Sequence, residues 1–551
     1  MKPLLPQNDK NPDRKAWMEK NRDRYRYDHE YLPPIPVLEE LPQEEAFTGG
    51  YLARRAAATA DLIPNMAAAK IKSIFDPFDE VQDFEDLFTI LPKPSTIRTW
   101  RTDEAFAEQR LSGANPMKMR QILHKDHLPF KICNLDQKIP GFRETLRQGL
   151  KEGRVFASDY SELDFIQGGT HEKGRKLLPK PKAVFFWQLM GYRDWGQLMP
   201  VAIQIHQDGP IMTPQGAPAM DWLIAKLCVQ IAHANHHELS SHLTRTHLVM
   251  GPFGIATARH LAENHPLGLL LRPHFRFMLA NTDLGQQSLM NKGGILDRLL
   301  AGTLEESLQV LSDSYKSWSV KEFAFPKDIE NRGLSDEAAL PHFPYRDDGL
   351  LIWGAVEKFV TSYIRLYYKK EKDVAQDTEL QAWAKELKDP DQGHVIDMTS
   401  PINTRQELID LVTTVIFTCG PQHGAVNFSQ YDYMAFVPNM PLAAYCPVPG
   451  QNPNTGAFEE EVDEQFLMQF LPPTRPTSEQ TQFAEILTSF KYDRLGFYED
   501  DAFEDPDALQ LVENFQQDLF QIERRIDLRN GKRQVPYPFM KPSEILNSIS
   551  M

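Results

Sequence analysis

The hydrophobic residues of this chain recur mostly at the three- and four-residue spacing of amphipathic helices. The spacing is sustained from about residue 50 to the end, and it is clearest in Tyr51–Leu62, Leu223–Thr246, Leu350–Lys370 and Gln406–Cys419. The alternation that is typical of strands is sparse, and Pro200–Ile205 is the best example. The pattern therefore predicts a mainly α fold with a small β-sheet.

Proline-rich segments interrupt this helical pattern. Those near residues 341–345, 438–450 and 472–476 predict loops. Residues 1–45 are rich in proline and charge, which is typical of an arm, whereas 46–551 show neither an internal repeat nor a low-complexity tract. We therefore predict an N-terminal arm followed by one large domain.

Basic and aromatic residues alternate in the arm, for example Arg14, Trp17, Arg24 and Tyr25. One interpretation is a segment that lies against anionic lipid headgroups, which attract clustered lysine and arginine. The other is a solvated arm that packs on the body of the protein. The amphipathic stretch Met66–Phe78 is a second candidate for contact with a membrane surface.

Composition narrows the class of protein. Hydrophobic residues make up 41% and charged residues 25%, as in ordinary soluble globular proteins. The net charge of −16 argues against nucleic acid as a partner, because such proteins normally carry a basic stripe. The four cysteines form no CxxC pair, and the sequence shows no signal peptide and no bilayer-spanning apolar run. We therefore expect a cytoplasmic protein, with at most peripheral membrane contact.

The densest chemistry lies between residues 233 and 247, where five of the sixteen histidines occur. The order His237, Glu238, His242 has one residue too many for a zinc-protease signature. His242 and His247 are five apart, which places them about 140° apart on a regular α-helix. A π-type turn would bring them onto one face, so the spacing predicts a local π-helical segment.

A second cluster contains His423 and Asn427, four residues apart and therefore on one face of a helix. A neutral imidazole and an amide carbonyl can both bind one metal ion. Each of these histidines taken alone is more often a hydrogen-bonded core residue.

The two clusters resemble the metal-binding helices of lipoxygenases, in which His-x4-His on one helix joins His-x3-Asn on another. The resemblance continues in family order from about residue 30 to the terminus, through Phe75-Asp-Pro-Phe-Asp79, Gln109-Arg-Leu-x-Gly113-x-Asn-Pro116, Pro200-x-Ala-Ile-Gln204, Trp222-Leu-x-Ala-Lys226, Phe253-x-Ile-Ala256, His265-Pro266, Tyr345-Arg-Asp-Asp-Gly-Leu-Leu-Ile-Trp353 and Asn547-Ser-Ile-Ser550. It implies one large helical catalytic domain with two long central metal-binding helices. The chain is similar to short bacterial members that lack the N-terminal β-barrel lipid-binding domain.

The resemblance also implies a set of metal ligands. They are His242, His247, His423, the side-chain carbonyl of Asn427 and the terminal carboxylate of Met551. Family members usually end in isoleucine or valine, but the ligand is a main-chain group, so methionine changes packing more than ligation. The mixed nitrogen and oxygen set suits redox-active iron better than zinc, with manganese as the alternative.

The implied reaction adds dioxygen to polyunsaturated fatty acids such as linoleate, linolenate and arachidonate, and yields hydroperoxides. In the family, a ferric hydroxide abstracts hydrogen from a bis-allylic carbon, and dioxygen adds to the opposite face of the radical. Glycine at position 285 is associated with R-configured products. The resemblance assigns the walls of the substrate and oxygen pocket to Gly285, Leu289, Leu243, Leu248 and Leu296.

Beyond the ligands, the family has a glutamine at Gln430 that hydrogen-bonds toward the asparagine ligand. Its plant partner glutamine is replaced here by Glu238, and Met440 replaces an arginine that plant enzymes place near the channel bottom. Two other activities stay open at this point. A fatty-acid hydroperoxide isomerase would use the same iron without consuming dioxygen, and a lipid carrier would keep the fold without the redox chemistry.

Overall fold

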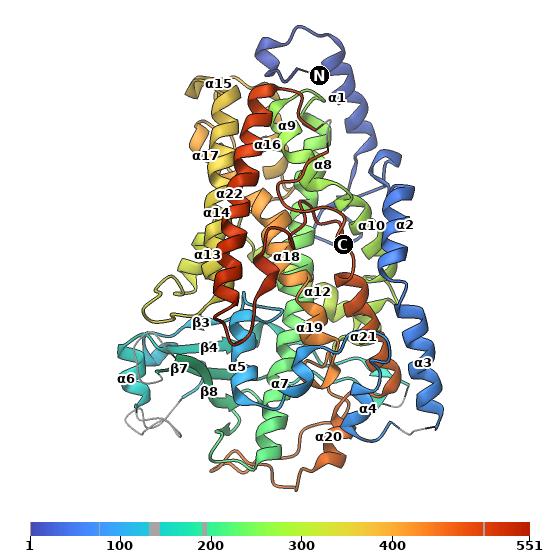
Figure 1. Ribbon diagram of the computed structural model, residues 1–551, viewed down its shortest axis with the longest axis vertical. Coiled ribbons are helices and arrows are strands. Elements are labelled where there is room, and N and C mark those ends of the chain that lie inside the picture. Colours follow the sequence, from blue (N-terminus) through green and yellow to red (C-terminus); the bar gives the residue numbers. More distant parts are fainter. Residues whose placement is uncertain (1, 76–77, 132–143, 173, 190–195, 500–501) are drawn as a thin grey trace.

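A bundle of long helices stands over a small antiparallel sheet in the computed structural model, which describes residues 2–75, 78–131, 144–172, 174–189, 196–499 and 502–551 (Figure 1). Helices hold 53% of the chain and strands 7%. The fold is therefore mainly α with a small sheet, as predicted. No helix in the described ranges combines the length and apolar character that crossing a membrane requires.

The N-terminal part supplies short helices and, among the described residues, all of the strands. Its helices are α1 (Asp13–Arg24), α2 (Gly49–Ala58), α3 (Leu62–Phe75), α4 (Val81–Glu85), α5 (Asp103–Ser112) and α6 (Leu146–Lys151). Its strands are β1 (Tyr27–Asp28), β2 (Val37–Leu38), β3 (Arg120–Gln121), β4 (Val155–Asp159), β5 (Thr170–His171), β6 (Gly174–Arg175), β7 (Lys182–Leu189), β8 (Gly196–Gln204) and β9 (Ile211–Met212).

The main sheet has the strand order β3-β4-β7-β8-β9, and all neighbours are antiparallel. Strand β8 contains the predicted strand Pro200–Ile205 except for its last residue, and it begins four residues earlier. Aromatic and β-branched side chains such as Val155 and Phe186 are fully buried in this sheet. They form part of a small second core between the sheet and α6.

The central and C-terminal helices form the body. They are α7 (Ala219–His236), α8 (Gly251–His260), α9 (Pro266–Phe275), α10 (Met278–Ser288), α11 (Ile295–Leu299), α12 (Leu304–Ser317), α13 (Phe325–Asn331), α14 (Pro344–Tyr367), α15 (Glu371–Ala375), α16 (Thr378–Lys388), α17 (Arg405–Phe417), α18 (His423–Asn427), α19 (Gln430–Met434), α20 (Glu464–Phe470), α21 (Thr474–Thr488) and α22 (Pro506–Asn530). The long helices α14 and α22 lie side by side, and α7 runs through the middle of the molecule (Figure 1).

The loop predictions for the proline-rich segments were partly wrong. Helix α14 begins at Pro344, helix α21 begins at Thr474, and Val437–Asn439 form a turn of 3-10 helix. Proline is tolerated in the first turn of a helix because the N–H group that it lacks has no intrahelical acceptor there. These prolines therefore mark helix starts as well as loops.

The arm lies against the body. On α1, the guanidinium of Arg14 forms two hydrogen bonds with the carboxylate of Glu379, with Nε–Oε1 at 2.5 Å and Nη2–Oε2 at 2.9 Å. Both side chains are buried. The side-chain amide of Asn21 donates to the carbonyl of Ala258 on α8 at 3.0 Å. At least one of the basic residues of the arm therefore serves internal packing.

Candidate metal centre

The two histidines that are five residues apart lie on a π-helix. Helix α7 continues directly into the π-helix His237–His247. The side-chain hydroxyls of Thr244 and Thr246 reach back to main-chain carbonyls five residues earlier, at 2.7 and 2.9 Å. This wider turn brings Nε2 of His242 to 3.0 Å from Nε2 of His247. The predicted helix defect is confirmed, and it turns both imidazoles in the same direction.

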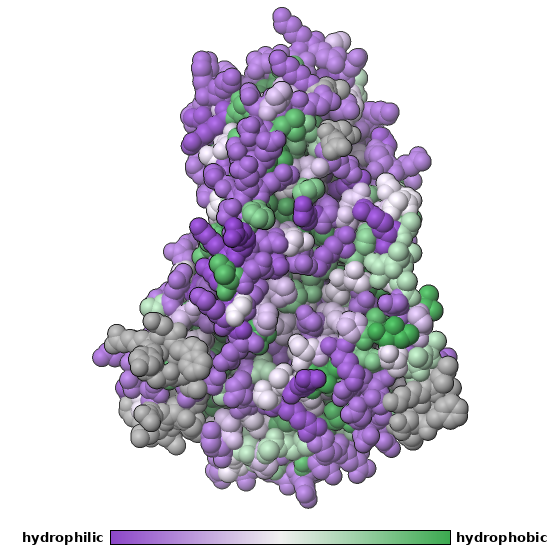
Figure 2. Space-filling view, in the orientation of Figure 1, coloured by the Kyte–Doolittle hydropathy of each residue, from purple (hydrophilic) through white to green (hydrophobic). Residues whose placement is uncertain are grey.

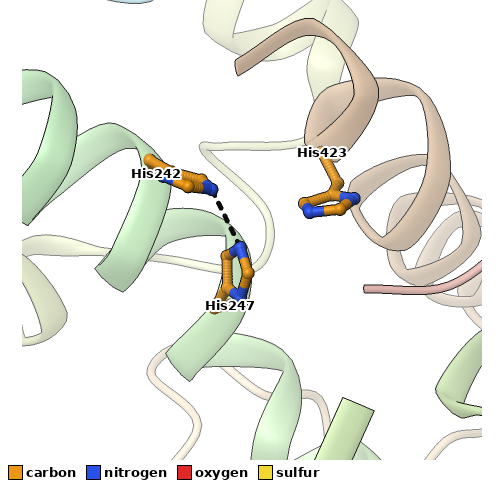
Figure 3. A group of neighbouring side chains, drawn as sticks. All are labelled: His242, His247 and His423. Carbon is orange, nitrogen blue, oxygen red and sulfur yellow. Dashed lines mark hydrogen bonds between the residues drawn. The ribbon is translucent and has the colours of Figure 1, made fainter. Parts of the chain in front are cut away.

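The third histidine comes from the facing helix. Helix α17 passes through a π-helical segment, Thr418–Gln422, into α18, whose first residue is His423. Its ring centroid lies 5.0 Å from that of His247 and 6.2 Å from that of His242. Each of the three rings offers one nitrogen within 4.8 Å of the others (Figure 3). Residues almost two hundred positions apart in the chain therefore form one cluster.

Burial favours the neutral form of His247 and His423. It lowers the pKa of His423 to about 3, and repulsion by His242 acts in the same direction, against a smaller effect of the Met551 main chain. Burial also lowers the pKa of His247 well below its usual value, and the neighbouring His242 and His423 add to this. Neutral imidazole is the form that binds metal ions, so His247 and His423 are ready to ligate at neutral pH.

The residues fit a metal ion. Neither ring nitrogen of His423 has a hydrogen-bond partner among the described residues, although the side chain is fully buried. Such buried polar atoms are normally satisfied. The 3.0 Å between the nitrogens of His242 and His247 is also the separation of two adjacent ligands at about 2.1 Å from one ion.

The other predicted ligands lie close to this cluster in different ways. Asn427 is fully buried at the end of α18, one turn after His423, and its Nδ2 donates to the carbonyl of Leu487 at 2.6 Å. The amide of Gln430 donates to the side-chain oxygen of Asn427 at 3.4 Å. Met551 is 1% exposed and lines the same cavity as His242 and His247.

Glu238 lies beside the cluster. Its Oε2 is 3.5 Å from Nδ1 of His242, the nitrogen on the side of the ring away from His247. A carboxylate in this place can orient the His242 ring and leave Nε2 facing His247. His237 is stacked against His242 with ring centroids 5.5 Å apart, and its own nitrogens have no hydrogen-bond partner among the described residues.

A cavity of about 410 Å³ is lined by His242 and His247, whereas His423 does not line it. All five residues that were assigned to the pocket wall lie on it: Leu243, Leu248, Gly285, Leu289 and Leu296. Glu238 lies on the wall as well, whereas Met440 and Gln430 do not line it. Met440 is fully buried elsewhere, and its carbonyl accepts a hydrogen bond from the amide of Gln480.

Sequence reasoning missed several cavity residues. Arg55 comes from α2, Leu284 and Met290 from α10 and the turn after it, and Ile486 from α21. No local pattern marks them, because they meet only when helices far apart in the chain pack together. A larger cleft of about 1260 Å³ lies between the arm and the body and includes Trp17 and Arg272. The three histidines do not line it.

Comparisons with known proteins agree with this geometry. The model of the lipoxygenase family matches residues 55–537. The chain belongs to the lipoxygenase family. Members of this family are non-haem iron dioxygenases, so a cluster of three histidines beside an apolar cavity is the expected centre of this lipoxygenase fold.

Individual relatives give the degree of similarity. A linoleate 9/13-lipoxygenase of Pseudomonas aeruginosa is 32% identical, over 85% of this chain and 69% of that protein. An allene oxide synthase-lipoxygenase protein of Plexaura homomalla is 30% identical over 93% of this chain, which spans 50% of that longer protein. The crystal structure of a coral 8R-lipoxygenase superposes with a TM-score of 0.89 at 28% identity, over 100% of this chain and 83% of the coral chain.

Proposed function

We propose that this lipoxygenase adds dioxygen to free polyunsaturated fatty acids of the linoleate, linolenate and arachidonate class. The observation that carries the proposal is the convergence of three buried histidines, two of which, His242 and His247, lie on the wall of an apolar cavity. A lipoxygenase that was crystallised in complex with arachidonate superposes on the whole chain with a TM-score of 0.91 at 28% identity, and this supports the substrate class.

His242, His247 and His423 are the proposed nitrogen ligands of an iron ion, with the side-chain oxygen of Asn427 and the terminal carboxylate of Met551 as oxygen ligands. Iron held there would supply the one-electron redox chemistry that begins fatty-acid dioxygenation. The donor set supports iron, because mixed imidazole and oxygen sites with an open position are typical of non-haem iron enzymes.

The cavity is proposed to position the fatty acid and to keep water away from the reacting carbon. Its leucine side chains, Leu243, Leu248, Leu289 and Leu296, present apolar surface to an acyl chain. Holding one bis-allylic carbon beside the histidines turns its oxidation into a reaction within a complex. The same walls exclude water from the radical, so dioxygen meets it only from the side that the cavity leaves open.

We further propose that the product is an R hydroperoxide. Gly285 lines the cavity and has no side chain, so space remains beside Leu289 for dioxygen. Two relatives support this configuration by their names, the coral 8R-lipoxygenase and a 12R-type arachidonate 12-lipoxygenase of Rattus norvegicus that is 30% identical over 99% of this chain.

The direct test is dioxygen uptake by the purified protein, with its metal content measured in the same sample. Linoleic acid should cause uptake with one conjugated diene formed per dioxygen consumed. Oleic acid, which has no bis-allylic carbon, should cause none. A folded, iron-loaded protein that consumes no dioxygen with linoleic, linolenic or arachidonic acid would overturn the proposal.

Arg55 is the proposed partner of the fatty-acid carboxylate. It is half-buried on the cavity wall, and it forms no ion pair with any carboxylate in the described part of the chain. Arg298, the other cavity arginine, is paired with Glu479 at 2.9 Å. A partly exposed cation on the wall of an apolar cavity suits the carboxylate of a free acid.

We predict that Arg55→Leu raises KM for linoleic acid about tenfold, because one charge-assisted hydrogen bond is lost at a partly exposed site. KM for methyl linoleate, which carries no charge, should stay the same. Arg54→Leu is the matched control, since Arg54 is on the same helix but does not line the cavity. Equal KM values for the acid in all three proteins would contradict the role of Arg55.

The proposed source of substrate is a bilayer that contains anionic lipid. On α2 and α3 the side chains of Leu52, Ile63 and Met66 are 50%, 76% and 36% exposed. Apolar surface gathers over these helices (Figure 2), and the segment from residue 48 to 70 has three cations against one carboxylate in a chain of net charge −16. Arg55 is on α2, and it also lines the cavity. Apolar side chains beside cations are typical of interfacial helices.

We predict that Ile63→Asp weakens co-sedimentation with phosphatidylcholine and phosphatidylglycerol vesicles several-fold, while turnover of dissolved linoleic acid is unchanged. Leu528→Asp is the matched control, because Leu528 is 70% exposed on the distant helix α22. If the two variants sediment alike, α2 and α3 are not the membrane surface.

A further inference from the structure

The last five residues of the chain are buried in the core. Residues Asn547, Ser548, Ile549, Ser550 and Met551 are each no more than 2% exposed. A chain end normally frays unless specific contacts hold it. The terminal carboxylate can serve as a ligand only if this segment is fixed, so each contact along it matters for the metal centre.

The first part of this tail is held by a polar network. The main-chain N–H of Gly496 donates to Oδ1 of Asn547 at 2.9 Å, and the ring of His274 contacts the Asn547 carbonyl at 2.9 Å. The hydroxyl of Ser548 donates to the carbonyl of Arg276 at 2.8 Å. The last of these contacts is at Ser548, three residues before the end of the chain. None of them involves the final peptide group, between Ser550 and Met551.

Tyr51 of α2 holds that final peptide group. Its hydroxyl donates to the carbonyl of Ser550 at 2.5 Å and lies 3.5 Å from Sδ of Met551. The ring is fully buried, stacked on Phe47 at 4.6 Å between centroids and tilted against Phe277 at 4.7 Å. A rigidly packed phenol therefore fixes the plane of the peptide bond from which the terminal carboxylate projects.

Arg55 follows Tyr51 by one helical turn, on the same face of α2. Arg55 also lines the cavity. One turn of α2 thus contacts the chain end through Tyr51 and lines the proposed substrate cavity through Arg55.

We propose that Tyr51 is a positioning residue that aims the terminal carboxylate of Met551 at the metal site, and that α2 couples occupation of the Arg55 end of the cavity to metal retention. The inference rests on the proposed function, because it takes the carboxylate as a ligand and a fatty acid as the occupant. Coupling of this kind is reciprocal: the acid must tighten metal binding by the same factor by which the metal tightens binding of the acid. We expect the tighter metal binding to appear as slower metal loss.

The first test is the rate of metal loss from the purified holoenzyme to an excess of chelator, measured with Tyr51→Phe. The variant keeps the ring and removes only the hydroxyl. We expect about tenfold faster metal loss, as for one lost buried hydrogen bond, and a changed electron paramagnetic resonance line shape of the ferric enzyme.

Tyr363→Phe is the matched control. Tyr363 is 1% exposed, and its hydroxyl donates to the carbonyl of Pro266 at 3.0 Å, so this variant also loses one buried tyrosine–carbonyl bond. Tyr363 does not line the cavity. Metal loss in this control should match the unmodified protein. Equal rates in all three proteins, with folding verified by thermal melting, would overturn the positioning role.

The second test addresses the coupling. Stearic acid, which cannot be oxidised at a bis-allylic carbon, should slow metal loss several-fold in the unmodified protein and in Tyr363→Phe, but not in Tyr51→Phe or Arg55→Leu. Methyl stearate should have no effect. Slowing by stearic acid that persists in Tyr51→Phe would overturn the coupling. If the unmodified protein still consumes dioxygen, that outcome overturns only the coupling and leaves the proposed function intact. If the unmodified protein consumes no dioxygen, the proposed function itself is overturned.

Discussion

Replacing His423 with alanine should abolish metal binding and dioxygen uptake together. The side chain is fully buried, and neither ring nitrogen has a hydrogen-bond partner among the described residues. Alanine supplies no ligand atom, and water can replace the lost imidazole in this buried place only at a cost in free energy. Loss of a residue that only supports a ligand already costs ten- to a hundredfold in metal affinity. For a ligand itself we expect less than a tenth of the normal metal content and at least a hundredfold slower uptake.

His233→Ala is the matched control for this prediction. His233 is also fully buried, on α7 just before the π-helix, and its Nδ1 contacts the hydroxyl of Tyr160 at 2.8 Å. It does not line the cavity. This variant should melt at a lower temperature and still bind metal. A His423→Ala protein with full metal content and normal uptake would refute the assignment of His423 as a ligand.

The measurement also separates the rival activities. A hydroperoxide isomerase would rearrange added linoleate hydroperoxide with no dioxygen consumed, and it too would lose activity with His423. A lipid carrier would bind the acid equally well in both proteins and turn over neither substrate. Only the dioxygenase makes uptake depend on His423 and on the bis-allylic carbon at once.

Replacing Gly285 with alanine should convert the main product from the R to the S hydroperoxide. A Cβ atom at this position would lie 3.8 Å from Cδ1 of Leu289 and 3.8 Å from Cε of Met290, which is ordinary van der Waals contact. The methyl group therefore fits without displacing the wall. It fills part of the cavity beside Leu289, which is the space that we assign to dioxygen.

Chiral chromatography of the reduced product measures the effect, and we expect at least a tenfold change in the ratio of R to S. Alanine is favoured over glycine within a helix, so the variant should be at least as stable as the unmodified protein. Gly354→Ala is the matched control, because Gly354 lies within α14 with open space around it. An unchanged ratio in Gly285→Ala would show that this position does not direct oxygen.

Much of the metal centre was predictable from residues close together in the chain. The five-residue spacing of His242 and His247 predicted the π-helix, because two side chains can face one ion only if the backbone turns to bring them together. The four-residue spacing of His423 and Asn427 similarly predicted one face of α18. The resemblance to the family then joined the two pairs, and neither spacing alone could do this.

The parts that escaped prediction all depend on contacts between distant segments. Arg14 meets Glu379 across 365 positions, and Tyr51 meets Ser550 across 499. Neither pair leaves a periodic signal, since such pairs are selected by the packing of whole helices and not by local spacing. The arm was accordingly ambiguous in sequence, and Arg14 was indistinguishable from a surface cation.

The sequence by itself determined the helical class, the two histidine-bearing helices and the π-turn, because hydrophobic periodicity and side-chain direction are local properties of the backbone. Only the tertiary structure decided that α2 places Arg55 on the cavity wall and contacts the chain end through Tyr51. The physical reason is that burial, which lowers the pKa of His423 and fixes the terminal peptide, exists only after elements from the whole chain have excluded water from one space.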